Sequence, residues 1–238
     1  MNIRKLFLAA TILFLWSGQA ARAEEDTSPT SIEGLPLVEV PANGQPTQLA
    51  VFYSGDGGWA QLDKGVSARL AASGTRVIGM SSLRYLWRER TPDEAAADLA
   101  RVLRFYLAEM KPATSVILVG YSTGADIMPF LVNRLPDLLR ARVASVTLIA
   151  PGHDAEFVIH VADWLPGRAT SGKPVMPEID RLGVPVLCLY GEGDTSTLCP
   201  ELPADRGTTV LIGKGHHLGG MYDAIAQRIL SFTAKAER

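Results

Sequence analysis

A chain of 238 residues with 47% hydrophobic and 20% charged residues is typical of a globular protein that buries a sizeable core. The formal net charge of −2 at pH 7 argues against the strongly basic surface of a nucleic-acid-binding protein, so we expect no nucleic-acid partner. The sequence contains no cofactor motif, and its four histidines show no metal-ligand spacing, so we expect neither a cofactor nor a metal.

Residues 1–23 have the pattern of a secretory signal peptide. A basic amino-terminal region precedes an apolar stretch from Leu6 to Trp16, and Ala21 and Ala23 form an A-x-A cleavage pattern. The apolar stretch is shorter than the roughly 20 residues that span a bilayer, which argues against a membrane anchor. We predict export to the periplasm with cleavage after Ala23.

The remaining chain predicts a flexible lead-in followed by one α/β domain. Residues 24–36 are polar and contain Pro and Gly, which is typical of a flexible segment. Over residues 37–238, short apolar runs rich in β-branched residues alternate with helical patterns. Strands are predicted at 48–55, 76–82, 115–122, 143–151, 185–194 and 208–217, and helices at 59–73, at 91–110 and after the strands that end at 122 and 217. Residues 152–182 are less regular and indicate an excursion between two strands.

These patterns predict an α/β fold. Runs that are apolar at nearly every position suit strands buried on both faces, so we expect a mostly parallel central sheet with helices on both faces. The helix at 91–110 begins with a predicted capping box, in which Thr91 is the N-cap and Glu94 is its partner.

Ser122 is the candidate nucleophile. It lies between Gly120 and Gly124 in a G-x-S-x-G pattern, with an apolar strand before it and a helical pattern after it. A strand that turns directly into a helix leaves no room for side chains beside the serine, which explains both glycines. The alternative is an ordinary serine in a glycine-rich loop.

An activated serine requires a base and an acid, which follow the serine in chain order in this architecture. Asp194 ends the predicted segment 185–194, after its apolar part "PVLCLY", and is the preferred acid, ahead of Glu192 and Asp154. His216 and His217 end the last predicted segment, 208–217, after its apolar part "TTVLI". We favour His216 as the base because it comes directly after a tight "GKG" turn.

The oxyanion of an acyl-transfer reaction requires backbone donors. The N–H of Thr123 is one candidate, and the N–H of Asp56 or Gly57 in the loop "YSGDGGW" is the other. The alternative for this loop is a simple glycine-rich turn in which Asp56 bonds its own backbone. An Asp56 side chain that projects into the pocket would favour a substrate with an ammonium group.

Two further features surround the candidate site. Arg84 and Arg88 follow a predicted strand, and they share a face if their segment is helical, which suits a phosphate or carboxylate; a solvated charged face is the alternative. Cys188 and Cys199 are the only cysteines, and after export they are expected to pair across the short loop that carries Asp194. Two buried thiols are the alternative reading of the cysteines.

Several stretches together resemble the bacterial VirJ/AcvB virulence-protein family within the α/β-hydrolase superfamily. They are "FYSGDGGWAQLD", "SLRYLWRERTPDEAAADL", "GYSTGADIMPF" with "NRLP", "LYGEGDTSTLCP" and "GKGHHLGG". The resemblance covers essentially the whole chain after residue 23 and implies a periplasmic serine hydrolase. The resemblance implies a hydrolase that, in some members of the family, is associated with cleavage of the aminoacyl ester of lysyl- or alanyl-phosphatidylglycerol. In plant-associated bacteria the family is associated with type IV secretion and virulence. It assigns the nucleophile to Ser122, the acid to Asp194 and the base to the His216/His217 pair.

The leading hypothesis is therefore an esterase of an aminoacylated phospholipid, which would meet the membrane surface through its substrate. A second hypothesis keeps the same residues but assigns another ester, thioester or peptide as substrate. A third is a periplasmic binding or escort protein for type IV secretion components, built on a hydrolase scaffold. A fold by itself does not separate these functions.

Overall fold

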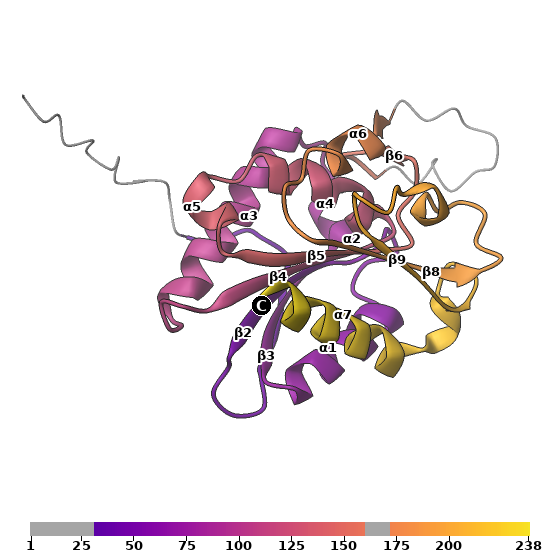
Figure 1. The fold of residues 1–238 in the computed structure, drawn as a ribbon. Helices are drawn as coiled ribbons and strands as arrows, with labels where there is room; N and C mark the ends of the chain where they lie inside the picture. Colours follow the sequence, from indigo (N-terminus) through magenta and orange to yellow (C-terminus); the bar gives the residue numbers. More distant parts are fainter. Residues whose placement is uncertain (1–30, 160–171) are drawn as a thin grey trace, which may run out of the picture.

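The computed structural model describes residues 31–159 and 172–238, which form a layered α/β structure around a central sheet (Figure 1). The sheet strands are β1 (Leu37–Val40), β2 (Gln48–Tyr53), β3 (Thr75–Met80), β4 (Ser115–Tyr121), β5 (Val143–Ile149), β8 (Val186–Glu192) and β9 (Thr208–Lys214). Their order in the 7-stranded sheet is β1-β3-β2-β4-β5-β8-β9. Every pair is parallel except β1 with β3, so the predicted mostly parallel sheet is confirmed.

Helices cover both faces of the sheet. The longer helices are α1 (Gln61–Ala72), α3 (Pro92–Ala108), α4 (Thr123–Asn133) and α7 (Tyr222–Ala236), and the short ones are α2 (Ser82–Tyr85), α5 (Asp137–Arg140) and α6 (Met176–Ile179). Figure 1 shows α1 and α7 on one face and α3 and α4 on the other. Neighbouring residues of β4 point to opposite faces of the sheet: Ile117 packs with α1 and α7, whereas Leu118 packs with α3 and α4. Strands buried on both faces explain why the sequence shows continuous apolar runs rather than alternation.

Local signals place the helix starts where the sequence predicts them. The Thr91 hydroxyl accepts a hydrogen bond from the Glu94 N–H, and the Glu94 carboxylate accepts one from the Thr91 N–H. This capping box satisfies two groups that an uncapped helix would leave without a partner. Pro92 occupies the first helical position, where the missing N–H costs nothing.

Strand β1 is absent from the sequence-based prediction. It has four residues, most of them partly exposed, and it pairs antiparallel with β3 at the edge of the sheet. The irregular segment 152–182 contains the two-stranded ribbon of β6 (Asp154–Ala155) and β7 (Lys173–Pro174), followed by α6; its residues 160–171 lie outside the described part.

Residues 1–30 also lie outside the described part of the chain. The signal peptide, its cleavage after Ala23 and most of the flexible lead-in therefore stay predictions. Within the described residues, no helix combines the length and apolar character that crossing a membrane requires.

Candidate active site

Ser122 occupies a sharp turn between β4 and α4. Its backbone has φ 50° and ψ −124°, and residues other than glycine seldom adopt a positive φ. The Ser122 N–H donates to the Ile149 carbonyl of the neighbouring strand β5 at 2.9 Å, which holds the turn in place. Strain of this kind costs about 1–3 kcal/mol and persists only where the surroundings enforce it.

Gly120 and Gly124 are required by packing, as the sequence predicts. A Cβ atom on Gly120 would lie 2.3 Å from the Gly124 carbonyl oxygen. One on Gly124 would lie 2.3 Å from the carbonyl oxygen of Tyr53 at the end of β2. Both contacts are with backbone, which has little freedom to move away, so the turn tolerates no side chain at either position.

The structure brings Ser122, His216 and Asp194 into one hydrogen-bonded chain. His216 Nε2 lies 2.9 Å from Ser122 Oγ, and His216 Nδ1 lies 2.9 Å from Asp194 Oδ2. The three residues come from the ends of β4, β8 and β9, which all finish at the same edge of the sheet. The Glu192 carboxylate instead lies 3.7 Å from Lys214 Nζ, and within the described residues it forms no hydrogen bond with either histidine.

The Asp194 carboxylate is held by its own loop. Its Oδ1 atom accepts hydrogen bonds from the Ser196 N–H at 3.1 Å and from the Ser196 hydroxyl at 2.6 Å. Burial would by itself raise the pKa of Asp194, but the hydrogen bonds from Ser196 and His216 outweigh it, so the pKa lies below its ordinary value. Asp194 is therefore ionised at neutral pH and oriented toward His216.

Close packing at the ends of β8 and β9 positions the acid and the base. A Cβ on Gly191 would lie 2.2 Å from the Gly215 carbonyl oxygen, so the two loops approach as closely as glycine allows. Cys188 and Cys199 form the expected disulfide, with an S–S distance of 2.04 Å and Cα atoms 5.6 Å apart. The disulfide closes the loop that carries Asp194.

His217 has a separate partner, Tyr121, which the sequence analysis did not single out. The Tyr121 hydroxyl is hydrogen-bonded to His217 Nδ1, and the Tyr121 ring lies 5.7 Å from the His216 ring. Burial, with a further contribution from the negative charges of Asp63 and Asp56, raises the pKa of Tyr121, so its hydroxyl stays protonated. The two histidines thus have different hydrogen-bond partners, and only His216 is bonded to Ser122.

The two predicted oxyanion donors lie on either side of Ser122. Thr123 is the first residue of α4, where helix geometry leaves the backbone N–H without an intrahelical partner. The loop that contains Asp56 lies against the serine, because a Cβ on Gly55 would be 3.3 Å from Ser122 Cβ. Among the described residues, neither the Thr123 N–H nor the Asp56 N–H forms a hydrogen bond.

A pocket of about 710 Å³ opens beside Ser122. Its walls include Asp56, Asp63, Tyr121, Ser122, His216, His217 and Tyr222. Asp63 is almost fully buried, and its Oδ2 atom accepts the Ala60 N–H at 2.9 Å while Oδ1 has no partner among the described residues. Burial raises the pKa of Asp63 to about 6. The acidic side of this pocket suits a ligand with a positive charge.

Asp126 is a further acidic residue near the site that sequence reasoning missed. It lies one helical turn after Ser122, and its Oδ1 atom accepts the Gly152 N–H at 2.6 Å. Burial, together with the negative charges of Asp56 and Asp154, raises the pKa of Asp126 to about 8. Its position four residues after the nucleophile was the only available signal, because Gly152 is distant in the sequence.

The arginines after β3 have different environments. Arg84 is in α2, but that helix ends at Tyr85, so Arg84 and Arg88 do not share a helical face. Both are exposed, and neither lines the pocket beside Ser122. Their segment nevertheless adjoins the loop beside Ser122, since a Cβ on Gly58 would lie 3.3 Å from Leu83 Cβ.

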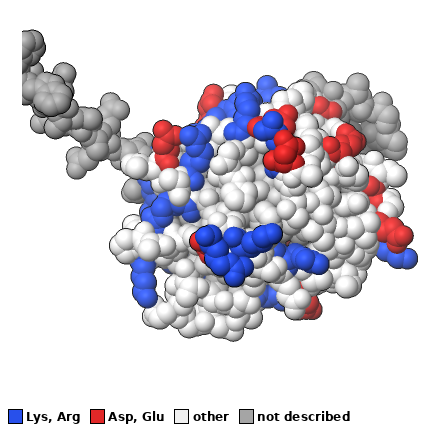
Figure 2. Space-filling model, viewed as in Figure 1, with Lys and Arg blue, Asp and Glu red and all other residues white. Residues whose placement is uncertain are grey.

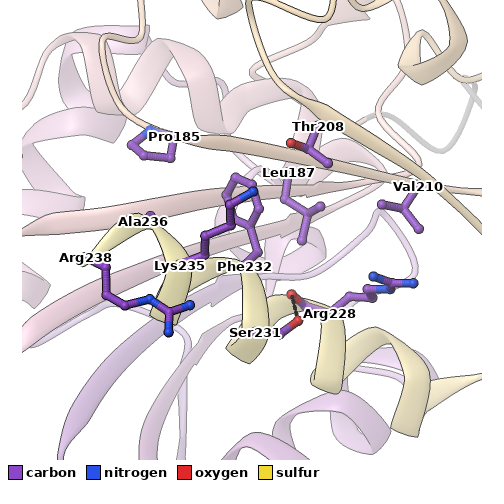
Figure 3. A pocket seen from close by; sticks show the side chains of 10 residues that line it. All are labelled: Pro185, Leu187, Thr208, Val210, Arg228, Ser231, Phe232, Lys235, Ala236 and Arg238. Carbon is purple, nitrogen blue, oxygen red and sulfur yellow. Dashed lines mark hydrogen bonds between the residues drawn. The ribbon is translucent and has the colours of Figure 1, made fainter.

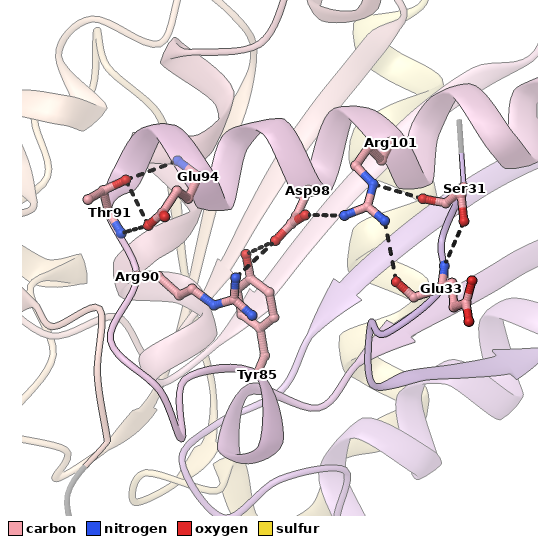
Figure 4. Close-up of polar contacts among 8 residues, drawn as sticks. All are labelled: Ser31, Glu33, Tyr85, Arg90, Thr91, Glu94, Asp98 and Arg101. Atoms are coloured by element: carbon pink, nitrogen blue, oxygen red, sulfur yellow. Dashed lines mark hydrogen bonds and ion pairs between the residues drawn. The ribbon is translucent and has the colours of Figure 1, made fainter. Parts of the chain in front are cut away.

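Arg90 belongs to a buried polar network, shown in Figure 4. Asp98 accepts hydrogen bonds from the Tyr85 hydroxyl at 2.8 Å and from Arg101 at 2.7 Å, and Arg90 lies 3.7 Å from it. Arg90 also stacks on the Tyr85 ring, with its guanidinium carbon 4.8 Å from the ring centre. This network fixes the segment that carries Arg84 and Arg88. In the part of the chain that the structure describes, no three His, Cys, Asp or Glu side chains are grouped to hold a metal.

Solved structures similar to this one define its fold class. Est1E from Butyrivibrio proteoclasticus, solved with ferulic acid bound, aligns with a TM-score of 0.62 at 13% identity, covering 87% of this chain and 98% of that chain. MenH from S. aureus aligns with a TM-score of 0.60 at 14% identity, covering 85% and 99%. The esterase domain of a Rhodothermus marinus protein aligns with a TM-score of 0.55 at 17% identity, covering 85% and 91%. The protein has an α/β-hydrolase-like fold.

The family follows from the sequence. Residues 47–237 match the family described as bacterial virulence protein (VirJ), so the chain belongs to the VirJ family. No curated protein matches the chain significantly.

Proposed function

We propose that this protein is a periplasmic serine hydrolase that cleaves a carboxylic ester, namely the aminoacyl ester of lysyl- or alanyl-phosphatidylglycerol. The observation that carries the proposal is the hydrogen-bonded chain from Ser122 through His216 to Asp194 at the wall of an acidic pocket. The α/β-hydrolase-like fold supports the ester chemistry, and the family resemblance supports the substrate class.

In the first half of the reaction, Ser122 Oγ attacks the ester carbonyl carbon. Asp194 accepts a hydrogen bond from the Nδ1–H of His216, which fixes the tautomer that leaves Nε2 free to accept the hydroxyl proton as the new C–O bond forms. The N–H groups of Thr123 and Asp56 stabilise the oxyanion, each worth about 2.7–4 kcal/mol of transition-state stabilisation. The bond to the lipid glycerol then breaks, and His216 transfers its proton to the departing oxygen.

In the second half, water hydrolyses the aminoacyl-serine intermediate. His216 takes a proton from the water as its oxygen attacks the acyl carbon, and it returns that proton to Ser122 Oγ when the free amino acid leaves. The strained backbone at Ser122 keeps Oγ exposed to both His216 and the pocket in each half of the reaction.

The acidic pocket supports a substrate with an ammonium group. Asp56 is exposed at the pocket wall, and the buried Asp63 carboxylate lies behind that wall with one oxygen that has no partner among the described residues. An aminoacyl group differs from an ordinary fatty acyl group by the positive charge next to the reacting carbonyl. Negative charge in the pocket attracts this group, and the attraction is stronger in a site shielded from water.

The first test is release of free amino acid from lysyl- and alanyl-phosphatidylglycerol by the purified protein lacking residues 1–23. We expect release that falls at least about 10³-fold in Ser122→Ala, because the nucleophile is lost. Ser73→Ala, an exposed serine at the end of α1, serves as the matched control and should retain full activity.

The outcomes separate the competing functions. Cleavage of a small aryl ester without cleavage of either lipid would keep the serine hydrolase and reject the lipid substrate. If neither ester is cleaved and Ser122→Ala still supports the biological role, a binding or escort protein linked to type IV secretion replaces the hydrolase.

A further inference from the structure

A second cavity lies away from the candidate active site, between α7 and the last two strands (Figure 3). Its volume is about 490 Å³, within the range of about 300–1,000 Å³ that is typical of small-molecule sites. Pro185 and Thr208, which line it, lie at the amino ends of β8 and β9, whereas Ser122 and His216 lie at the carboxyl edge of the sheet. We call this cavity the α7 groove.

The α7 groove exists because α7 does not cover the last strand. The helix packs mainly against α1, β5 and β8, and β9 is the edge strand of the sheet. Leu187 on β8 and Val210 on β9 face Phe232 on α7, and the three side chains give the groove an apolar wall (Figure 3). Val210 and Phe232 are only partly buried, so apolar surface remains open to a ligand.

Basic residues border this apolar wall. Arg228, Lys235 and Arg238 line the groove, and the described residues that line it include no acidic one. Among the described residues, none of these three side chains forms an ion pair. Figure 2 shows Lys and Arg gathered over the carboxyl-terminal half of α7, beside a broad surface without charged residues. Glu237 is the acidic residue nearest to Lys235 and Arg238 in the sequence, but it does not line the groove. Its Oε1 atom accepts a hydrogen bond from Gln48 Nε2 at 3.5 Å.

From this combination we infer that the α7 groove binds a single-chain amphipathic anion, such as an alkyl phosphate or an alkyl carboxylate, as a free molecule. The alkyl chain lies along Val210 and Phe232, over the buried Leu187, and the head group lies between Arg228 and Lys235. An apolar chain removes exposed apolar surface from water, at about 25 cal/mol per Å². The anionic head pairs with cations that form no ion pair within residues 31–159 and 172–238. A concave cavity bordered by side chains suits one chain rather than the flat surface of a bilayer.

The inference is tested by calorimetric titration with decyl phosphate below its critical micelle concentration. We expect saturable binding that weakens roughly tenfold or more in the double variant Arg228→Gln/Lys235→Gln, because two charge-assisted contacts are lost. Lys111→Gln, which removes an exposed lysine elsewhere, is the matched control and should bind as the unchanged protein does.

Ligand variants test each half of the proposed chemistry. Decyltrimethylammonium should bind at least roughly tenfold more weakly than decyl phosphate, since its head group has the wrong charge, and inorganic phosphate should bind more weakly by a similar factor, since it lacks the chain. Equal affinity for any of these ligands, or equal affinity of the double variant and the unchanged protein, would overturn the inference. Binding to phosphatidylglycerol vesicles without binding to monomeric decyl phosphate would also reject it.

The inference is independent of the proposed function. Arg228 and Lys235 lie outside the catalytic pocket, so the double variant should hydrolyse esters at the unchanged rate. Perturbation of the Leu187 and Val210 amide NMR signals by decyl phosphate would place the ligand in the α7 groove. Perturbation confined to Ser122 and His216 would instead assign the binding to the catalytic pocket and reject the groove.

Discussion

Asp126 is the residue whose charge depends most clearly on the fold. Its pKa of about 8 lies far above the value near 3.9 of an aspartate in an unfolded chain. Between these two pH values the folded protein holds a proton that the unfolded chain has released. The free energy of unfolding therefore decreases as pH rises through this window, by at most about 1.4 kcal/mol per pH unit.

Replacement of Asp126 by asparagine should remove this pH dependence. The amide does not titrate, and its oxygen still accepts the Gly152 N–H, so Asp126→Asn should be more stable than the unchanged protein at pH 7 by at least about 1 kcal/mol. The difference should be smaller at pH 5. Urea unfolding of both proteins from pH 5 to 8 measures it, and parallel stability curves would show that Asp126 ionises normally in the folded protein.

At the scale of elements, the segment from α2 to the start of α3 is anchored by residues packed inside the protein and carries other side chains that are exposed. The network around Asp98 anchors Arg90 and Tyr85, while Trp87 is 61% exposed between Arg84 and Arg88. An aromatic ring beside arginines is typical of residues at a membrane interface. The segment adjoins the loop beside Ser122, so a phosphate bound to it would lie on the same side of the molecule as Ser122, as the proposed lipid substrate requires.

This arrangement predicts a substrate-dependent effect of the two arginines. The double variant Arg84→Ala/Arg88→Ala should lower kcat/KM for the lipid ester roughly tenfold, because it loses contacts with the phosphate. Turnover of a small neutral ester should not change, since neither arginine lines the catalytic pocket. Steady-state kinetics on both substrates, with Lys111→Ala as control, measures the change in kcat/KM for each. An equal loss of kcat/KM on the two substrates would reject the phosphate role.

At the scale of the whole molecule, three strand ends and one disulfide assemble the candidate site. The Cys188–Cys199 disulfide closes a short loop at a sequence separation of 11, and the loop contains Asp194. A crosslink over a loop of about this length stabilises a protein by roughly 2–3 kcal/mol, mainly by restricting the unfolded chain.

Loss of the disulfide should therefore lower both stability and activity. Reduction by dithiothreitol should lower the thermal unfolding midpoint by roughly 5–10 °C, and it should reduce ester turnover because the Asp194 loop is less constrained. The variant Cys188→Ala/Cys199→Ala should unfold at a similarly reduced temperature, with no further response to reductant. Thermal unfolding followed by circular dichroism checks this, and equal midpoints with and without reductant would contradict it.

Much of the candidate site was predictable because its signals are local or follow a simple topological rule. Gly120 and Gly124 mark a turn with no room for side chains, and the structure shows the backbone contacts that exclude them. Carboxyl ends of parallel strands meet at one edge, so chain order was sufficient to bring Ser122, Asp194 and His216 together. Their catalytic roles stay predictions for the ester assay.

Other features depend on contacts between distant parts of the chain. Strand β1 needs β3 as its partner, the pairing of Tyr121 with His217 joins two loops, and the raised pKa of Asp126 comes from the burial and charges that the folded chain places around it. The sequence alone determined the α/β alternation, the capping of α3 and the turn at Ser122, because each depends on neighbouring residues. Only the tertiary structure decided which histidine faces Ser122, the end of α2 before Arg88 and the uncovered face of β9, because packing between elements sets all three.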